Sequence, residues 1–331
     1  MVYYSVSNSY YLHHKTLRLK TFEFLADQLP FGFSYNFDNY LFNKIKHINT
    51  QGINKRADCF IVNNVKKRIE GKIHFLLKDE VAYSPFKSLF GSFEFNPRIH
   101  PNLLTEFWSF IESDLAEKEV NKVNIVNHAE CYAPMKAELV KKTLENAGFY
   151  VTLKATNHHI EIGKSSLESN MHLMELRRLK KSKDLGFTFK EETKENAEEI
   201  YDFLEKCREE QSIQLSISKE RFFEYLEEFP QNYPVFSVRN QDQLLAATIA
   251  TRVHRNILYS YLPGSLRRFK QYSPSVMLNE GLYIYCQNHQ IELLDLGIST
   301  EKDGTEQQSL AEFKERIGAI KSHKFFFEKM L

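Results

Sequence analysis

The second half of the chain alternates between two hydrophobic periods, and this alternation predicts an ordered series of strands and helices. Alternating apolar and polar positions indicate a strand, and apolar positions three and four apart indicate a helix. The predicted strands are Gly186–Lys190, Val235–Val238, Leu244–Thr251, Ile257–Leu262, Glu292–Leu296 and Ala319–Phe327. The predicted helices are Lys194–Glu210, Lys219–Glu228, Ser273–Gln290 and Gln307–Ile317. Few α/β folds join a three-strand meander to helical crossovers in this order.

The first half repeats the later part of the same element order: three strands, a helix, a strand, a helix and a strand. Its predicted strands are Cys59–Asn64, Lys72–Leu77, Ser92–Phe95, Val123–Val126, Tyr150–Leu153 and His159–Ile162, and its predicted helices are Pro101–Glu119 and Met135–Ala147. One face of the first helix carries Leu104, Phe107, Trp108, Ile111 and Leu115. This spacing packs a helix against a sheet. Residues 1–55 show no clear period, and no element is predicted there.

The recurring order predicts an α/β protein with two domains, residues 1–168 and residues 169–331, joined between Ile162 and Asn170. The length of 331 residues exceeds one typical domain. A hydrophobic content of 42%, with 27 Phe and 17 Tyr, supplies enough apolar bulk for two cores. Each domain is expected to contain a mixed, mostly antiparallel sheet flanked by helices.

Positive and negative charges nearly balance, with 44 Lys and Arg against 43 Asp and Glu. This balance argues against a chain that binds nucleic acid along its whole length, and it leaves a local basic face possible. The four cysteines form no CxxC pair, which fits a reducing compartment. The pairs His13-His14 and His158-His159 lack a third ligand at metal spacing, so no metal is predicted. Met1–Lys20 has no continuous apolar stretch, so we predict no secretory signal or membrane span and expect a cytoplasmic location.

Three short motifs follow one another through the second half. The stretch Met171–Phe189 reads as a basic helix that ends at Gly186, and the segments LDLG (Leu294–Gly297) and FKERIG (Phe313–Gly318) come later. The element order resembles the GNAT acyltransferases. The motifs are similar to the R-x-x-x-R-K-A-x-x-x-G, D-x-G and F-K-x-x-x-G segments of the FemAB-like, or peptidoglycan-bridge, branch of that superfamily. The chain departs from the pattern in lacking a long coiled-coil arm and the R/Q-x-x-G-x-G/A loop.

The resemblance implies two tandem GNAT-like domains, of which the second binds the acyl donor and the first is degenerate or faces the acceptor. The donor would be acetyl-CoA or another acyl-CoA. The acceptor would be an amine of a small molecule or a cell-envelope precursor. In GNAT sheets the fourth and fifth strands splay apart and pair with the pantetheine arm. Here these strands are Ile257–Leu262 and Glu292–Leu296, so Leu262 would face the donor.

The pyrophosphate of the donor would lie at the start of the helix that follows, where N–H groups are unpaired and the dipole is positive. Ser273 suits the N-cap, and Pro274 suits the first helical position. Further candidates for phosphate contact precede or follow them: Gly264, Arg267, Arg268 and Ser275. The alternatives are an ordinary capped helix after a polar loop, or a loop that suits an aminoacyl-tRNA donor.

Acyl transfer to an amine needs one group that removes a proton and another that returns a proton to the leaving group. Tyr259 and Tyr261 point to one face of their strand, and either could protonate a thiolate or simply fill the core. Asp295 ends a strand, where open α/β sheets place ligands. It could bind or deprotonate the amine, or cap the loop that contains Ser299. Lys314 could reach an anionic substrate group, face solvent or pair with another group of the protein.

The leading hypothesis is an N-acyltransferase that works by direct attack, because no nucleophile elbow, phosphate-binding GxxxxGK[ST] or dinucleotide GxGxxG motif is present. Catalysis would rest on positioning and on oxyanion stabilisation by strand amides. One alternative is an aminoacyl-tRNA-dependent ligase of the FemAB type, with tRNA held by Arg177, Arg178 and Lys181. Another is a non-catalytic binding protein with a GNAT fold. The sequence does not indicate the oligomeric state.

Overall fold

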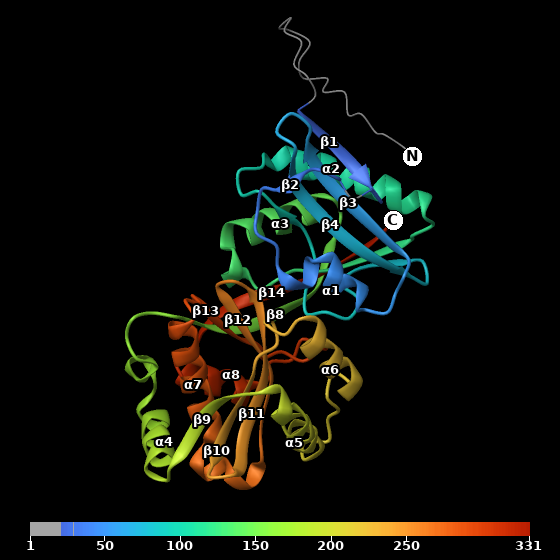
Figure 1. The fold of residues 1–331 in the computed structure, drawn as a ribbon. Helices are drawn as coiled ribbons and strands as arrows, with labels where there is room; N and C mark the ends of the chain where they lie inside the picture. Colours follow the sequence, from blue (N-terminus) through green and yellow to red (C-terminus); the bar gives the residue numbers. More distant parts are fainter. Residues whose placement is uncertain (1–20, 29) are drawn as a thin grey trace, which may run out of the picture. The chain divides into compact units, whose positions relative to one another are not determined.

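A computed structural model describes residues 21–28 and 30–331, which form two compact units (Figure 1). The first unit contains the described residues up to Lys154 together with His323–Leu331, and the second contains Ala155–Ser322. The chain therefore passes from one unit to the other within two strands. The predicted domain boundary at residue 168 falls inside the second unit, and the division at that residue stays a prediction. His13 and His14 lie outside the described residues.

The first unit contains a mixed sheet whose strands follow the order β1-β3-β4-β5-β7-β14. These strands are β1 (Phe22–Ala26), β3 (Arg56–Asn63), β4 (Arg68–Lys78), β5 (Val81–Ser84), β7 (Lys122–Val126) and β14 (Ile320–Met330). The short strands β2 (Ser34–Tyr35) and β6 (Glu94–Phe95) pair with β4. Its helices are α1 (Ile45–Asn49), α2 (Pro101–Glu117) and α3 (Pro134–Asn146).

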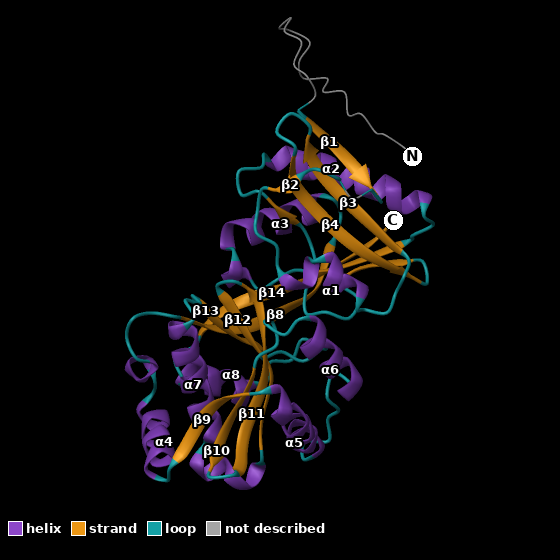
Figure 2. Ribbon diagram, in the orientation of Figure 1, coloured by secondary structure: helices purple, strands orange, loops and turns teal. Residues whose placement is uncertain are grey.

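The core of the first unit lies where α2 and α3 pack against this sheet (Figure 2). The predicted apolar face of α2 is confirmed, because Leu104, Phe107, Trp108, Ile111 and Leu115 are all buried in it. Two phenylalanines of β14 join the same core, although they lie more than 200 residues further along the chain: Phe325 and Phe327. Residues from both ends of the sequence thus build one hydrophobic cluster.

The second unit contains the sheet order β8-β13-β12-β11-β10-β9. The strands are β8 (Tyr150–Glu161), β9 (Phe187–Glu192), β10 (Val235–Asn240), β11 (Gln243–His254), β12 (Ile257–Ser265) and β13 (Leu293–Ile298). The helices are α4 (Leu173–Asp184), α5 (Ala197–Glu209), α6 (Lys219–Glu228), α7 (Pro274–Asn288) and α8 (Gln308–Arg316). Helices α4 and α7 lie on one face of the sheet and α5 on the other (Figure 2). Neighbouring strands run antiparallel except β12 and β13, which are parallel.

The predicted α/β class and every element predicted in the second half are confirmed, with bounds that shift by a few residues. Two predictions in the first half need correction. The strands predicted at Tyr150–Leu153 and His159–Ile162 form one continuous strand, β8, because the polar residues between them also pair in the sheet. Strand β5 was not predicted, since its four residues are too few to show a period.

Candidate functional site

The parallel strands β12 and β13 separate after a short run of pairing. They pair at Ile257 with Leu293, Leu258 with Leu294 and Tyr259 with Asp295. Beyond Tyr259, β12 continues to Ser265 paired with β11, and β13 continues paired with β8. The predicted opening between the fourth and fifth strands of the GNAT order is therefore present in the described part of the chain.

A β-bulge at Gly297 accounts for this separation. The register of β13 with β8 shifts between Asp295 and Gly297, and Gly297 has a φ of 76°. A bulge with glycine in the left-handed region bends its strand and increases the local twist. A Cβ at this position would lie 2.8 Å from the Tyr259 hydroxyl. Both the backbone angle and the neighbouring tyrosine therefore require glycine here.

Two charged side chains hold the bulge in place. The Asp295 carboxylate accepts hydrogen bonds from the Gly297 N–H (2.8 Å) and the Asn157 side-chain amide (3.0 Å). Lys314 donates to the carbonyls of Gly297 (2.9 Å) and Ile298 (3.0 Å). Lys314 is 6% exposed, so the alternative of a solvent-facing lysine is wrong. Burial lowers the pKa of Lys314 to about 8, and the charge of Asp295 partly opposes this effect.

The two predicted tyrosines lie side by side on the face that carries Asp295. Their ring centroids are 6.2 Å apart, and the Tyr261 hydroxyl lies 3.2 Å from the Ser216 hydroxyl. Burial raises the pKa of Tyr259, and the charge of Asp295 raises it further. Burial also raises the pKa of Tyr261, with an opposing effect from the Ser216 hydrogen bond. Both hydroxyls therefore keep their protons at neutral pH and can act as donors.

The segment between β12 and α7 places the predicted phosphate contacts around a helix start. Helix α7 begins at Pro274, and Ser273 occupies the N-cap in the left-handed region with a φ of 44°. Ser273 is the N-cap residue, as predicted, but its hydroxyl donates to the Lys270 carbonyl (3.4 Å) and does not accept from an N–H of the first turn. Ser275 donates to the Ser265 hydroxyl (3.0 Å). The first turn of α7 therefore has no side-chain cap from its N-cap residue.

The two arginines of this segment are exposed. The Arg267 backbone N–H donates to the Glu210 carboxylate (3.0 Å), and the Arg268 guanidinium lies 4.8 Å from the centre of the Phe269 ring. The structure thus fixes the backbone of Arg267 and leaves its side chain in solvent. Neither side chain is committed to a buried ion pair, which is the arrangement expected of residues that meet an anionic ligand at a surface.

Residues 262–264 of β12 have mainly packing roles. Leu262 is buried and pairs with Ile249 of β11. A Cβ on Gly264 would lie 2.8 Å from the Leu204 side chain, so glycine lets α5 approach β12 closely. Pro263 therefore has no N–H to donate to a pantetheine arm, and its carbonyl already accepts a hydrogen bond from Arg208 (3.2 Å).

Ser299 lies within the protein rather than at a surface. Ser299 and His158 are both 0% exposed, and the serine hydroxyl lies 3.1 Å from the His158 Nδ1 atom. The other ring nitrogen, Nε2, lies 3.6 Å from the Glu315 carboxylate. Burial lowers the pKa of His158, so its ring is neutral at pH 7. This contact secures the end of β13 against β8.

The basic run on α4 is divided between structural and exposed residues. Arg178 donates to both oxygens of Glu175, whose carboxylate is fully buried, and Lys183 pairs with Glu168 and Glu280. The side chains that remain exposed on this helix are Arg177, Lys180 and Lys181. Leu173, the first residue of α4, is 67% exposed. The positively charged surface that a ligand could reach is therefore smaller than the sequence of the helix indicates.

The first unit contains a comparable parallel pair, β5 and β7, and the segment around Gly91 forms hydrogen bonds with the ends of both strands. Strand β5 pairs with β7 over all four of its residues. The Gly91 N–H donates to the carbonyl of Val126, the last residue of β7 (2.9 Å), and the Ser92 N–H donates to the side chain of Ser84, the last residue of β5 (2.9 Å). A Cβ on Gly91 would lie 2.5 Å from the Ser84 carbonyl carbon. The segment around Gly91 therefore occupies the place that is open in the second unit.

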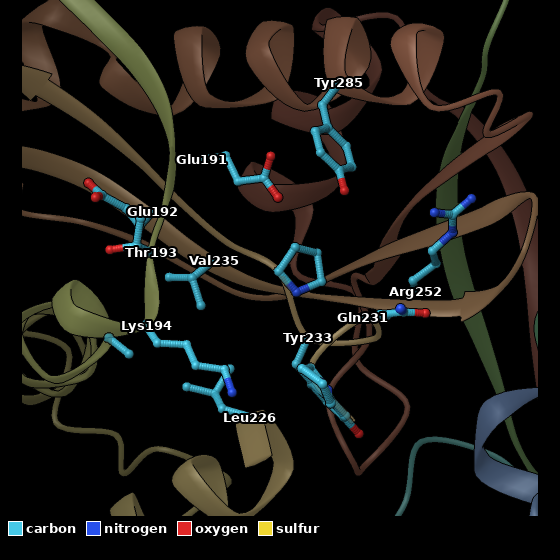
Figure 3. Close-up of a pocket in the computed structure, with 13 residues that line it drawn as sticks. Glu191, Glu192, Thr193, Lys194, Leu226, Gln231, Tyr233, Val235, Arg252 and Tyr285 are labelled. Carbon is cyan, nitrogen blue, oxygen red and sulfur yellow. The ribbon is translucent and has the colours of Figure 1, made fainter. Parts of the chain in front are cut away.

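A separate cavity of about 310 Å³ lies in the second unit, where β9 ends and β10 begins (Figure 3). Its polar lining includes Glu191, Lys194, Arg252 and Tyr285. None of the residues that the sequence predicted as functional line this cavity. Within the described residues, no group of three His, Cys, Asp or Glu side chains is placed to hold a metal ion, and no helix is both long and apolar enough to cross a bilayer.

Sequence reasoning missed several polar residues that the fold brings to the opening. Asn157 and His159 reach Asp295 from β8, Ser216 reaches Tyr261 from the segment before α6, and Thr251 lies opposite Tyr259. His159 belongs to the His158-His159 pair, whose spacing in the sequence indicates neither a metal site nor a catalytic role. The other three had no signal, because their partners lie between 8 and about 140 positions away in the sequence.

Comparisons with known proteins relate this arrangement to acyltransferases. Residues 173–315 match the family model of the acetyltransferase (GNAT) domain. No curated protein matches the sequence of the chain. The structure of FemX, a FemAB-family protein, has a TM-score of 0.68 at 12% identity and covers 89% of this chain and 93% of its own.

Two further solved structures share the fold at similar identity. The C-terminal domain of a protein assigned as a lysylphosphatidylglycerol synthetase from Agrobacterium fabrum has a TM-score of 0.52 at 11% identity, covering 78% of this chain and 80% of its own. The structure of L-PGS from Bacillus licheniformis has a TM-score of 0.51 at 11% identity, covering 82% and 83%. The predicted resemblance to tandem, FemAB-like GNAT proteins is thereby confirmed. The family match supports a transferase of acyl or aminoacyl groups.

Proposed function

We propose that this protein is an acyltransferase that moves an acyl group from acetyl-CoA or another acyl thioester to an amine of a small molecule or cell-envelope precursor. The observation that carries the proposal is the opening between β12 and β13, which the bulge at Gly297 keeps apart. The GNAT-family match over residues 173–315 supports it independently. The second unit holds the donor in this proposal.

The donor binds along β12 and at the start of α7. The pantetheine arm follows the β12 main chain near Leu262, and the pyrophosphate meets the first turn of α7 at Ser273 and Ser275. A helix start attracts phosphate through unpaired N–H groups and its positive dipole end. Arg267 and Arg268 add positive charge from the solvent side. Gly264 contributes by letting α5 pack closely against this strand.

The chemistry takes place beside the tyrosines. Tyr261, or Tyr259 next to it, donates a proton to the leaving sulfur, and the raised pKa values of both hydroxyls keep that proton in place at neutral pH until the thiolate forms. Asp295 attracts the acceptor ammonium by charge. Lys314 and Ser299 remain predicted substrate-binding residues, and their contacts with the end of β13 support a part in shaping the site.

Calorimetric titration with acetyl-CoA and longer acyl-CoA esters tests the donor assignment. We expect a dissociation constant below millimolar for at least one of them. Arg267→Ala and Arg268→Ala should each weaken that binding several-fold, since each removes a charge-assisted phosphate contact. Arg98→Ala, a change at an exposed arginine of the first unit, is the matched control. If no ester binds better than millimolar, the proposal is wrong.

A ligase that uses aminoacyl-tRNA is the second candidate, and two observations favour it. Pro263 interrupts the main-chain pairing that a pantetheine arm uses, and the exposed residues Arg177, Lys180 and Lys181 present positive charge on α4. Such a protein should bind tRNA with an affinity that falls steeply between 50 and 200 mM salt, because counterions are released on binding. The variant Arg177→Glu/Lys181→Glu should bind more weakly and with a shallower salt dependence than Lys141→Glu/Lys142→Glu, a pair of changes on α3.

A protein kept only for binding would behave differently from both. It would show neither tRNA binding nor a thermal shift with CoA esters while remaining normally folded. Thermal melting with each ligand therefore separates the three readings in one experiment.

A further inference from the structure

A row of polar side chains crosses four strands of the second unit at the level where β12 and β13 separate. Cross-strand register places His159 of β8 opposite Asp295 of β13, Asp295 beside Tyr259 of β12, and Tyr259 opposite Thr251 of β11. Residues directly opposite one another point to the same face of a sheet, with Cβ atoms about 5 Å apart. The four side chains therefore form one continuous polar row.

Two members of this row are buried without a hydrogen-bond partner. His159 is 5% exposed and Thr251 is 0% exposed. Neither the His159 Nδ1 atom nor the Thr251 hydroxyl has a partner among the residues that the structure describes. A buried polar atom left unpaired costs about 1–3 kcal/mol, and such atoms are rare in folded proteins. Both lie on the strands that flank β12 and β13, at the level where these two separate, so a ligand that enters between them could satisfy these groups.

The surroundings of His159 suit a group that accepts and releases a proton. Burial lowers the pKa of His159, while the negative charges of Asp295 on the neighbouring strand and Glu161 on its own strand raise it. The ring is therefore neutral at pH 7, and a carboxylate beside it stabilises the charged form once a proton arrives. Tyr259, the other titratable group in the row, stays protonated and adds no charge.

We propose that His159 is the general base of the transfer reaction and that Asp295 stabilises its protonated form. This inference rests on the proposed function. His159 takes one proton from the acceptor ammonium, and the amine nitrogen then bonds to the acyl carbon as the carbon–sulfur bond breaks. The Tyr261 hydroxyl gives its proton to the sulfur, and the resulting phenolate takes the second proton from nitrogen. His159 finally releases its proton to solvent, so the products are an amide, a free thiol and one proton.

The variant His159→Gln tests this role, because it keeps a polar side chain of similar size and removes the base. We expect kcat to fall about 10²- to 10⁴-fold at neutral pH. The KM for the acyl donor should change little. The wild-type profile of kcat against pH should rise and then level off above the pKa of His159, and this levelling-off should disappear in the variant, whose rate keeps rising about tenfold per pH unit as solution hydroxide replaces the base. His289→Gln, a change at the exposed histidine that follows α7, is the control and should keep the wild-type profile.

A second measurement separates the base from a merely structural histidine. Proton NMR titration of His159 should give a lower midpoint in Asp295→Asn than in the wild type, and thermal melting checks that each variant folds. A folded His159→Gln protein that keeps both its rate and the levelling-off of its pH profile would overturn the assignment while the acyltransferase proposal stands. A wild-type protein that transfers no acyl group from any donor overturns both.

Discussion

Two buried charged side chains, Asp295 of β13 and Lys314 of α8, make hydrogen bonds at the end of β13. Asp295 accepts from a backbone N–H and a side-chain amide, and Lys314 donates to two backbone carbonyls. Burying a charge is costly unless hydrogen bonds replace its water. Here the charges compensate for main-chain groups that the bulge at Gly297 removes from the sheet ladder. Both residues are therefore needed for the shape of the strand end, whatever they contribute to chemistry.

His128 of the first unit gives a residue-level prediction about stability and pH. Burial lowers its pKa to about 4, helped by the charges of Lys136 and Lys324, and opposed by the hydrogen bond with the Ala129 carbonyl (2.8 Å). Above pH 6.5 the ring is neutral in both folded and unfolded chains, and the native state keeps its full stability. Between pH 6.5 and 4 the unfolded chain binds a proton that the folded chain does not, so up to about 3 kcal/mol is lost.

Urea unfolding followed by Trp108 fluorescence measures this effect, because the single tryptophan is buried in the first unit. His128→Gln should lose less stability between pH 7 and 4.5 than the wild type. His172→Gln, at an exposed position before α4, should leave the slope unchanged. Equal slopes in all three proteins would contradict a buried neutral His128.

At the scale of elements, the parallel pairs β12–β13 and β5–β7 end in different ways. Strand β12 pairs with β13 over three of its nine residues, and β5 pairs with β7 over its whole length of four. The ends of β5 and β7 also receive hydrogen bonds from the segment around Gly91. Of these two pairs, the one in the second unit leaves strand main chain open beside it.

The bulge that opens β13 gives a prediction at this scale. Gly297→Ala should destabilise the second unit by about 1–3 kcal/mol, since alanine is strained at a φ of 76° and its Cβ would meet the Tyr259 hydroxyl. Adding Tyr259→Phe removes the hydroxyl and should recover the part due to the clash, but not the part due to the backbone. A double-mutant cycle of thermal or urea unfolding measures that coupling. Simple additivity of the two changes would show that the hydroxyl and the glycine do not meet.

Sequence patterns predicted the elements better than the site. Alternation found Tyr259 and Tyr261 on one face, and the Pro274 signal located the start of α7. Lys154–Asn157 reads as a polar break, yet its residues pair within β8 because partners exist on neighbouring strands. The contacts of the site could not be predicted, because they too depend on partners that are distant in the sequence. The contact of Asn157 with Asp295 spans 138 positions, and no local period encodes it.

For the whole molecule, the two passages of the chain between the compact units matter most. Strand β14 pairs with β7 from Phe326–Val126 to Met330–Lys122, so the first unit takes a strand from the far end of the sequence. Deleting residues 323–331 should therefore unfold or strongly destabilise the first unit, as seen by Trp108 fluorescence. The loss removes two buried phenylalanines, each worth about 3–5 kcal/mol, together with a strand.

Point changes in β14 check that the core contacts, and not the deletion as such, are responsible. Phe327→Ala should lower the stability reported by Trp108 by about 3–5 kcal/mol, because its side chain is 2% exposed. Phe326→Ala, the neighbour on the opposite and half-buried face, should cost clearly less. Retention of a folded Trp108 environment after the deletion would show that the first unit is complete without β14.

Strand β14 also constrains the order in which a newly made chain can fold. Proteins of several domains commonly fold each one as it leaves the ribosome. The sheet of the first unit cannot follow that course, because it stays one strand short until residue 330 has emerged. Its apolar β7 edge must wait while the intervening 168 residues of the second unit are synthesised, and this interval is when the protein is most exposed to aggregation and most dependent on chaperones.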